Sequence, residues 1–408
     1  MAKPSHTEIA ENSVQDALVA RLIRPDLGWK FVAANELPRQ TDDVLIETWV
    51  SDALTRLNRS IGETPSRADE VLARLRAVTL SEPNDGLLAA NEEMVAWLCG
   101  RRTMRLEGRD DYEAIRLIDF EDPCANQLTV STEVTFDAVH KPRRYDLVLW
   151  VNGFPLVVGE TKTPDSLYYS WLDGANDISK AYEIKTAAFF VPNVLSFATE
   201  GKELHYGALG QAPETWLPWL SSQDAPLALG LPSVLRSAEL LLAPGRILDI
   251  LRTFTFFARR QAVRGDQVTK VIPRYPQVEA VEAIVTRVLD QNRDRGLIWH
   301  HQGSGKTLII AFASARLRQM DLLDAPTILV VLDRLELIDQ MRAEFAAVGL
   351  PGVQVAETRE DLRRLLRDDA RGIIITTIFR FSDPSVINTR KNIVVMVDEA
   401  HRTQEGRL

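Results

Sequence analysis

The segment His301–Thr307, HQGSGKT, is the feature that most limits how this chain can fold. It lies between the apolar segment GLIWH (296–300), which we expect to form a strand, and a helix expected to begin near Lys306. A glycine-rich loop between a strand and a helix binds polyphosphate through its backbone amides and the helix N-terminus. The sequence therefore predicts a nucleotide site in an α/β sheet, and a chance GSGKT turn is the alternative.

The loop itself supplies most of the expected nucleotide ligands. Lys306 should reach the β- and γ-phosphates, and Thr307 should ligate Mg²⁺. Gly303 and Gly305 let the backbone bend and approach the phosphates. The loop departs from the full GxxxxGK[ST] pattern at its first position, where this chain has His300. The loop residues expected to contact the nucleotide are Gly303, Ser304, Gly305, Lys306 and Thr307.

A second segment should complete this site. NIVVMVDEAH (392–401) is typical of a buried strand that ends in Asp398 and Glu399, so both carboxylates should emerge where open α/β sheets bind ligands. Asp398 should hold the Mg²⁺, and Glu399 should orient or deprotonate the attacking water. DEAH resembles motif II of superfamily 2 helicases and translocases. Upstream, RYPQ resembles the segment whose glutamine contacts adenine in that superfamily, which makes Gln277 the candidate; a plain exposed glutamine is the alternative.

The pattern of apolar residues differs between the two halves of the chain. Residues 8–117 are mostly amphipathic helix, and strand-like segments follow, with NGFP (152–155) as a hairpin turn. From Lys270 short apolar strands alternate with helices, which is typical of a parallel sheet covered on both faces. The other expected elements of the first half are strands at 128–136, 145–152, 156–162 and 187–199, helices at 176–184 and 247–260, and an irregular connection at 210–244.

Composition excludes several classes of protein. The 408 residues suffice for two or three domains, and 48 basic against 57 acidic residues give a net charge of −9. An acidic total argues against a surface that attracts nucleic acid everywhere, but allows a local basic channel. Two cysteines, Cys99 and Cys124, rule out a disulfide scaffold. With a polar N-terminus and no apolar stretch of membrane-spanning length, we expect a cytoplasmic protein without a membrane segment.

The first half carries a different set of candidate residues. Asp146 lies near the start of one expected strand, and the next strand ends in Glu160 and Lys162. If the strands pair as a hairpin, Glu160 and Lys162 share one face and converge with Asp146. Asp146 and Glu160 would then bind Mg²⁺, which supplies Lewis acidity and a hydroxide nucleophile. Lys162 would stabilise phosphate charge or position the water.

The pattern D-x13-E-x-K resembles the PD-(D/E)xK nuclease core, in which Asp146, Glu160 and Lys162 would be the catalytic residues. Glu11, in the N-terminal helix, is a candidate for an extra acid of that core. An exposed hairpin with Glu and Lys on its solvent face is the alternative.

With both halves in this order, the sequence resembles the restriction (R) subunit of type I restriction-modification enzymes. The resemblance implies an α/β chain: a mixed-sheet, restriction-endonuclease-like domain at 1–260, with a connecting segment at about 210–260, and the first RecA-like P-loop lobe at 261–408. The segments that carry the resemblance are LGWKF (27–31), RRYDLVLWVNGFPLVVGETK (143–162), WLDGANDISKAYE (171–183), VPNVLSFATEG (191–201), LRTFTFF (251–257), and IWHHQGSGKT (298–307) through VDEAHRTQ (397–404).

The resemblance also implies an activity. Such a subunit joins a methyltransferase and a specificity subunit, hydrolyses ATP to translocate double-stranded DNA, and cuts the DNA at distant, non-specific positions as a defence against foreign DNA. ATP and Mg²⁺ are the implied cofactors, and S-adenosylmethionine would enter only through the methyltransferase.

The sequence departs from the family pattern at two positions, Ile178 and Phe379, where the family commonly has glutamine. The family often has a Gln-x-x-x-Tyr element after the catalytic lysine, and here Tyr182 is present but Ile178 occupies the place of the glutamine, with Asn176 or Lys180 as substitutes. The sequence also ends at Leu408, soon after DEAH, so we expect the second RecA-like lobe to be missing and nucleotide hydrolysis by this chain alone to be poor.

Two other functions remain open from the sequence. One is a superfamily 2 helicase or remodelling ATPase with a non-catalytic, DNA-binding N-terminal module. The other is a fragment that only docks onto partner subunits.

Overall fold

The computed structural model divides the chain into two compact units, unit 1 (Met1–Ile272) and unit 2 (Pro273–Leu408). They meet later in the chain than the boundary expected at residue 260, because a hairpin at 256–271 belongs to unit 1. The structure describes residues 6–138, 141–164, 168–220, 230–262, 265–290, 292–301, 303–350, 352–381 and 388–399.

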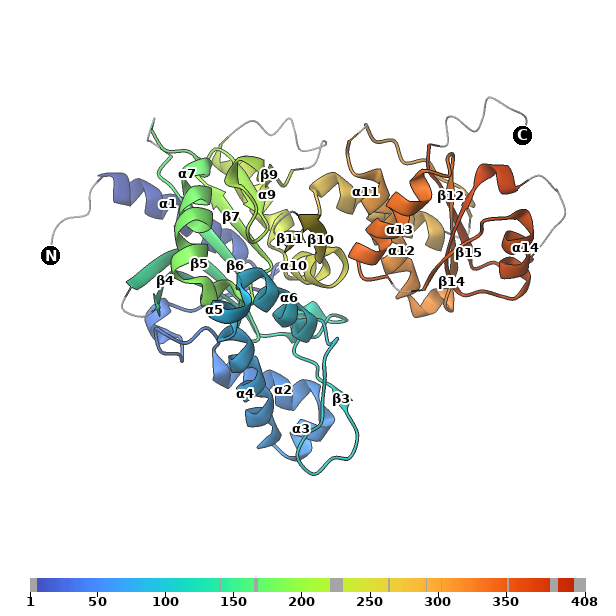
Figure 1. Ribbon diagram of the computed structural model, residues 1–408. Coiled ribbons are helices and arrows are strands. Elements are labelled where there is room, and N and C mark those ends of the chain that lie inside the picture. Colours follow the sequence, from blue (N-terminus) through green and yellow to red (C-terminus); the bar gives the residue numbers. More distant parts are fainter. Residues whose placement is uncertain are drawn as a thin grey trace. The chain divides into compact units, whose positions relative to one another are not determined.

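Most of the described residues from His6 to Leu98 are helical, as expected. In Figure 1, α2, α3 and α4 gather beneath the sheet of this unit. Helix α4 carries Leu72 and Leu75 on its buried face, at the spacing of an amphipathic helix. The helices are α1 (His6–Leu22), α2 (Glu47–Leu57), α3 (Arg59–Glu63), α4 (Arg67–Thr79), α5 (Glu82–Asp85) and α6 (Leu87–Leu98).

A mixed sheet of seven strands forms the core of unit 1, in the order β1-β4-β5-β6-β7-β8-β9. The pairs β1–β4 and β6–β7 are parallel, and the other neighbours are antiparallel. The main strands are β4 (Leu128–Ala138), β5 (Lys141–Val151), β6 (Phe154–Thr161), β7 (Leu195–Thr199) and β8 (Leu204–Gly207); the short edge strands are β1 (Lys30–Phe31) and β9 (Leu217–Pro218).

The register of the β5–β6 hairpin determines which residues lie together in the candidate carboxylate site. Its turn forms as predicted, with left-handed φ angles of 49° at Asn152 and 85° at Gly153. A Cβ at Gly153 would lie 2.5 Å from the carbonyl oxygen of Ile46, so a side chain there would clash with the backbone before α2. The register pairs Leu147 with Gly159, which brings the middle of β5 beside the end of β6.

Three predicted elements of unit 1 are wrong in part. The expected strand at 187–199 begins only at Leu195, because the chain first forms a 3-10 turn at Ala187–Phe190 before Pro192. The expected helix at 247–260 consists of α10 (Pro244–Asp249) and a π-helical turn (Ile250–Phe254), after which the phenylalanine-rich segment forms the hairpin β10 (Phe256–Ala262) and β11 (Gly265–Val271). The irregular connection contains a helix, α9 (Leu231–Leu241), with buried Val234 and Ala238.

Unit 2 is a parallel sheet covered on both faces, as the apolar runs predict. Its strand order is β13-β14-β12-β15. In Figure 1, α11, α12 and α13 lie on one side of the sheet and α14 on the other, and a buried apolar cluster fills each interface. The elements are α11 (Tyr275–Leu289), α12 (Lys306–Arg318), β12 (Thr327–Leu332), α13 (Leu337–Ala347), β13 (Val353–Val355), α14 (Arg359–Arg367), β14 (Gly372–Thr377) and β15 (Ile393–Val397).

The strand predicted for GLIWH, before the glycine-rich loop, is wrong. Residues 292–300 contain no regular secondary structure, and the side chains of Leu297 and Trp299 are 74% and 85% exposed. An apolar run becomes a strand only where a neighbouring strand pairs its backbone groups. Here no described strand pairs with the segment, and β15 pairs only with β12.

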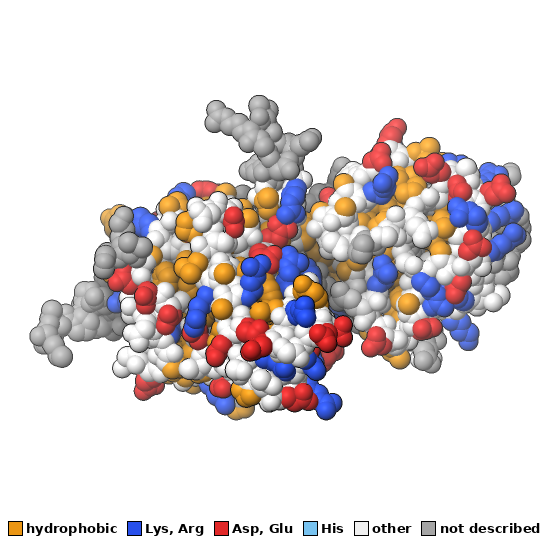
Figure 2. Space-filling model, turned by 60° about the horizontal axis from the view of Figure 1, so that its bottom comes forward, with side chains coloured by type: hydrophobic (Ala, Val, Ile, Leu, Met, Phe, Trp, Pro, Cys, Tyr) orange, Lys and Arg blue, Asp and Glu red, His pale blue; other side chains and the backbone are white. Residues whose placement is uncertain are grey.

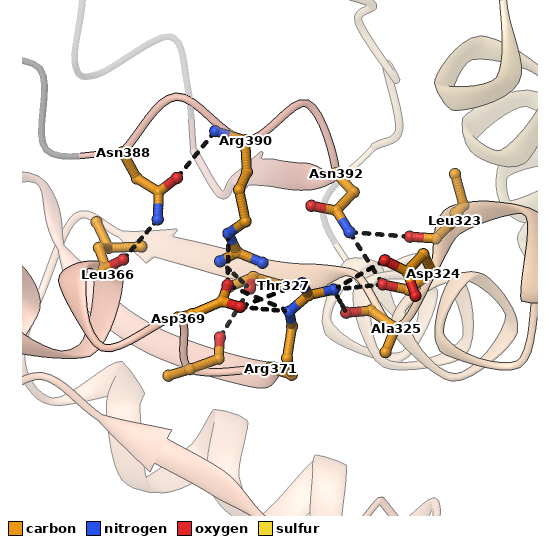
Figure 3. A network of polar contacts seen from close by, with 11 residues as sticks. Leu323, Asp324, Ala325, Thr327, Leu366, Asp369, Arg371, Asn388, Arg390 and Asn392 are labelled. Carbon is orange, nitrogen blue, oxygen red and sulfur yellow. Dashed lines mark hydrogen bonds and ion pairs between the residues drawn. The ribbon is translucent and has the colours of Figure 1, made fainter.

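A polar network joins the amino ends of β12, β14 and β15 (Figure 3). Asp369 pairs with Arg371, before β14, and with Nε of Arg390, before β15, at 2.7 Å. Arg390 also donates to Thr327 Oγ1 at 2.9 Å, and Arg371 donates to the carbonyl of Asp324 at 2.5 Å. The network fixes the edge of the sheet opposite to the one that carries Asp398.

The charged side chains on the surface and the apolarity of the helices are as the composition led us to expect. On the face drawn in Figure 2, Lys and Arg side chains are interspersed with Asp and Glu, so neither unit shows a field of a single sign there. No helix in the part of the chain that the structure describes has both the length and the apolarity that a membrane crossing requires.

A lysine is buried where the β10–β11 hairpin packs against the rest of unit 1. Lys270 is 3% exposed, and its Nζ donates to the carbonyl oxygen of Asn193 at 2.5 Å. Burial lowers the pKa of Lys270 from 10.5 to about 7, against the opposing charge of Glu183. Between these two pKa values the unfolded chain binds a proton that the folded chain does not, so the unfolding free energy should rise with pH above about 7.

Substituting Lys270→Met should remove this rise in stability. We expect the wild-type chain to gain up to about 1.4 kcal/mol in unfolding free energy per pH unit above pH 7, relative to the variant. Urea unfolding followed by tryptophan fluorescence measures it, because seven of the eight tryptophans lie in unit 1. Parallel pH profiles for the two proteins would contradict a lysine that is neutral in the folded state.

Candidate functional site

The first candidate site lies where the middle of β5, at Asp146, meets the end of β6, at Glu160. Asp146 is 8% exposed, and its Oδ2 accepts hydrogen bonds from the backbone N of Thr161 at 2.7 Å and from Thr161 Oγ1 at 3.0 Å. Because Thr161 follows Glu160, these bonds hold the two carboxylates at one end of the hairpin. Burial raises the pKa of Asp146, and the bonds from Thr161 oppose the rise.

Glu160 is more deeply buried than Asp146. The residue is 3% exposed, and its Oε1 accepts from Lys162 Nζ at 2.8 Å and from the hydroxyl of Tyr182 at 3.3 Å. Burial, and then the charge of Asp146, raise the pKa of Glu160 to about 8. The expected convergence of Glu160 and Lys162 on one face is present, and Asp146 is close enough to perturb Glu160.

The donor set fits a divalent cation. Glu160 Oε2 is buried and has no hydrogen-bond partner among the described residues, so it has free lone pairs beside a second carboxylate. The described residues contain no group of three or more His, Cys, Asp or Glu side chains that could hold a metal ion. Two carboxylates suffice for Mg²⁺, which keeps several of its waters. The side chain of Glu11, the candidate extra acid, lies outside the described residues.

A π-helical turn after α7 (Trp171–Asn176) supplies the other groups of this site. The turn, η3 (Asp177–Tyr182), places Asp177 Oδ2 2.7 Å from Lys162 Nζ. The carboxylates of Glu160 and Asp177 outweigh the effect of burial on Lys162 and raise its pKa. Helix α7 packs tightly here, since a Cβ at Gly174 would lie 3.2 Å from Glu160 Cγ.

Of the two substitutes considered for the missing glutamine, Lys180 pairs away from the site, and a role for Asn176 stays a prediction. Ile178 is fully buried among apolar groups, and Lys180 pairs with Glu214 at the protein surface, 3.4 Å away. Asn176 directly precedes Asp177, and its Oδ1 is buried without a hydrogen-bond partner among the described residues. The residue that reaches Lys162 from this turn is Asp177.

Sequence reasoning missed three residues of this site. Asp177 holds Lys162, and Thr161 holds Asp146. Gln15, on α1, donates to the backbone carbonyl of Asp146 and to Glu133 Oε1 at 3.2 Å. The apolar residues around Gln15 predict the helix, but nothing in them indicates which strand its polar side chain meets.

The second candidate site is the glycine-rich loop of unit 2. Gly303 and Gly305 have left-handed φ angles of 81° and 82°, as expected of residues that curve a loop around phosphates. Lys306 is the first residue of α12 and Thr307, half-buried, is the second. Ser304 is buried, and its Oγ has no partner among the described residues. The loop and the N-terminus of α12 thus have the backbone geometry expected of an anion-binding loop, and anion binding itself stays a prediction.

The side chain of Gln277 is hydrogen-bonded to the backbone of this loop. It is 3% exposed; its Oε1 accepts from the backbone N of Arg274 at 2.9 Å, and its Nε2 donates to the carbonyl of Ser304 at 3.2 Å. A Cβ at Gly305 would lie 2.4 Å from Gln277 Nε2, so a side chain there would displace the Gln277 amide, and the φ of 82° also favours glycine. The contact between Gln277 and adenine stays a prediction.

The acidic pair after β15 reaches the same loop. The backbone N of Asp398 donates to the carbonyl of Val331, which continues the pairing of β15 with β12. Glu399 has a φ of 49° and places its Oε1 3.4 Å from Lys306 Nζ. Burial raises the pKa of Asp398, and Lys306 opposes the rise. Lys306, Asp398 and Glu399 therefore lie together, as their sequence positions predicted.

Comparisons with known proteins match both units. A family model described as the type I restriction enzyme R protein N terminus matches residues 8–215, and a model of the SWI2/SNF2 ATPase matches residues 276–408. The HindI type I restriction enzyme endonuclease subunit of Haemophilus influenzae is 29% identical, over 97% of this chain and 39% of its own length. The putative MjaVIIIP endonuclease subunit of Methanocaldococcus jannaschii is 24% identical, over 93% of this chain and 38% of its own length.

A third similar protein comes from another bacterium. The SauCOLORF180P type I restriction enzyme endonuclease subunit of Staphylococcus aureus is 26% identical, over 73% of this chain and 32% of its own length. The chain thus spans less than two fifths of the length of each of these three relatives.

Proposed function

The chain belongs to the family of type I restriction enzyme R proteins, and on this premise we propose that unit 1 is a Mg²⁺-dependent endonuclease and unit 2 is the first RecA-like lobe of an ATP-driven translocase of double-stranded DNA. The observation that carries the proposal is the buried cluster of Asp146, Glu160 and Lys162, where Glu160 Oε2 is left without a partner. A solvent-exposed hairpin, the alternative considered from the sequence, would not bury these groups.

In unit 1, Asp146 and Glu160 would hold the Mg²⁺, which supplies Lewis acidity and lowers the pKa of a bound water. Lys162 lies on the same face, where its Nζ donates a hydrogen bond to Glu160 Oε1. It would stabilise the negative charge that develops on the attacked phosphate. The hydroxyl of Tyr182 donates to Glu160 Oε1, because burial and the nearby carboxylates raise the pKa of Tyr182 and keep it protonated. That bond orients Glu160.

In unit 2, the loop amides and Lys306 would bind the triphosphate of ATP, and Thr307 and Asp398 would hold the Mg²⁺ that accompanies it. Glu399, beside Lys306, would orient the attacking water. Gln277, predicted to contact adenine, also fixes the backbone of the loop through Ser304. Closure of a second lobe over the nucleotide would complete the site, as in other translocases.

The proposed partners follow from the family. We expect double-stranded DNA as substrate and a methyltransferase and a specificity subunit as protein partners, with S-adenosylmethionine bound by the methyltransferase only. Cutting by unit 1 would then be non-specific in sequence and distant from the recognition site, since translocation by unit 2 moves the DNA.

The test is a cleavage assay with the assembled complex. The R subunit that contains this chain is mixed with its methyltransferase and specificity partners and with unmodified circular DNA. We expect linear DNA only when both ATP and Mg²⁺ are present. Cleavage without ATP, or ATP turnover without cleavage, would contradict the proposal.

A further inference from the structure

The ammonium group of Lys162 lies between two carboxylates of different character. Its Nζ is 2.8 Å from Glu160 Oε1 and 2.7 Å from Asp177 Oδ2. The side chain of Glu160 is 4% exposed, whereas that of Asp177 is 48% exposed. Glu160 therefore belongs to the enclosed site, and Asp177 holds the ammonium from the solvent side.

This arrangement creates a competition at Glu160. A divalent cation on Glu160 and the ammonium of Lys162 carry the same sign of charge and seek oxygens of the same carboxylate. Like charges that share a site repel each other unless a counter-charge lies close to one of them. Asp177 is that counter-charge, because it contacts Lys162 and no other described lysine or arginine pairs with it.

The π-helical turn explains how Asp177 reaches the site. Residues five apart in an α-helix of 3.6 residues per turn point about 140° away from each other. Asp177 and Tyr182 are five apart, yet both face the end of β6: one contacts Lys162 and the other contacts Glu160. The wider turn of η3, with Glu183 N donating to the carbonyl of Ile178, aligns them.

We propose that Asp177 is a positioning residue that draws the ammonium of Lys162 off Glu160, so that the two catalytic carboxylates are free to take a divalent cation while Lys162 stays in the site. This inference rests on the proposed nuclease function. Without Asp177, Glu160 is the one carboxylate left to Lys162 in the described structure, and a cation must displace the ammonium to bind.

The experiment is calorimetric titration of the 408-residue chain with Mn²⁺, without DNA or nucleotide. Asp177→Asn keeps the shape of the side chain and removes its charge, and we expect the Kd for Mn²⁺ to rise about tenfold. Lys180→Ala is the matched control, because Lys180 lies on the same turn but pairs with Glu214 at the surface. Its Kd should equal that of the wild-type chain.

A double-mutant cycle separates positioning from a structural role. In a Lys162→Met background there is no ammonium to hold, so Asp177→Asn should no longer change the Kd. An equal loss of affinity in both backgrounds would overturn the inference and show that residue 177 acts through the fold. An unchanged Kd for Asp177→Asn in the wild-type background would overturn it as well.

Glu160→Gln distinguishes failure of this inference from failure of the proposed function. If Glu160→Gln abolishes Mn²⁺ binding but Asp177→Asn leaves it unchanged, the metal site stands and the role of Asp177 falls. If Glu160→Gln leaves binding unchanged, the cation does not bind to this carboxylate, and both the proposed function of unit 1 and the role of Asp177 fall.

Discussion

Asp146→Asn should abolish DNA cleavage by the assembled enzyme, with a fall in rate of at least about a thousandfold, and should leave ATP hydrolysis within about twofold of the wild-type rate. The amide keeps an oxygen that accepts from Thr161, so the hairpin should retain its register. What it loses is the charge that would hold Mg²⁺ beside Glu160. The measurement is linearisation of unmodified circular DNA and, in parallel, phosphate release.

Glu214→Gln is the matched control for this substitution. It also removes one carboxylate from unit 1, but Glu214 is exposed and, among the described residues, forms its ion pair with Lys180. Its cleavage rate should equal that of the wild-type enzyme. Full cleavage by Asp146→Asn would favour the alternative in which unit 1 only binds DNA.

Lys306→Ala should abolish ATP hydrolysis, by more than about a hundredfold, and with it the ATP-dependent cleavage of DNA. Lys306 is the cation at the N-terminus of α12 that would reach the β- and γ-phosphates, and its Nζ lies 3.4 Å from Glu399 Oε1. Removing it leaves Glu399 without that partner and the triphosphate without its lysine. Phosphate release and cleavage are measured in the same reactions.

Lys391→Ala is the control for Lys306→Ala. Lys391 is an exposed lysine of unit 2, just before β15, and lies at the edge of the sheet opposite to the nucleotide site. The control should hydrolyse ATP at the wild-type rate. Should Lys306→Ala lose ATP hydrolysis but keep cleaving DNA, cutting by unit 1 would not depend on unit 2.

The grouping of Asp146, Glu160 and Lys162 was predictable because it depends on local rules. NGFP fixes a tight turn, the turn fixes the register of two strands, and the alternation of side chains places Glu160 and Lys162 on one face. The approach of Asp398 and Glu399 to the glycine-rich loop was predicted from the ends of two parallel strands. Only β15 forms as expected, because the strand predicted before the loop is absent from the described residues.

The contributions of Thr161, Asp177 and Gln15 were not predictable in this way. The contact of Gln15 depends on two elements that are remote in sequence, and that of Asp177 depends on a π-helical turn that replaces the expected helix. Thr161 lies in the same hairpin as Asp146, but the side-chain pattern does not indicate which groups bond to the carboxylate. No pattern of apolar residues marks a turn in which residues five apart align. At GLIWH the sequence pattern predicted an element that does not form. An apolar run becomes a strand only if a partner strand is available, and the run itself does not show whether one is.

The most direct test of the nuclease site is to locate a bound cation. A crystal of the chain is soaked in Mn²⁺, and the anomalous signal of manganese is measured. The account predicts a peak coordinated by carboxylate oxygens of Asp146 and Glu160, including Oε2 of Glu160, with Lys162 still paired to Asp177. A saturating soak that gives no peak at these carboxylates, or a peak only elsewhere on unit 1, would contradict it.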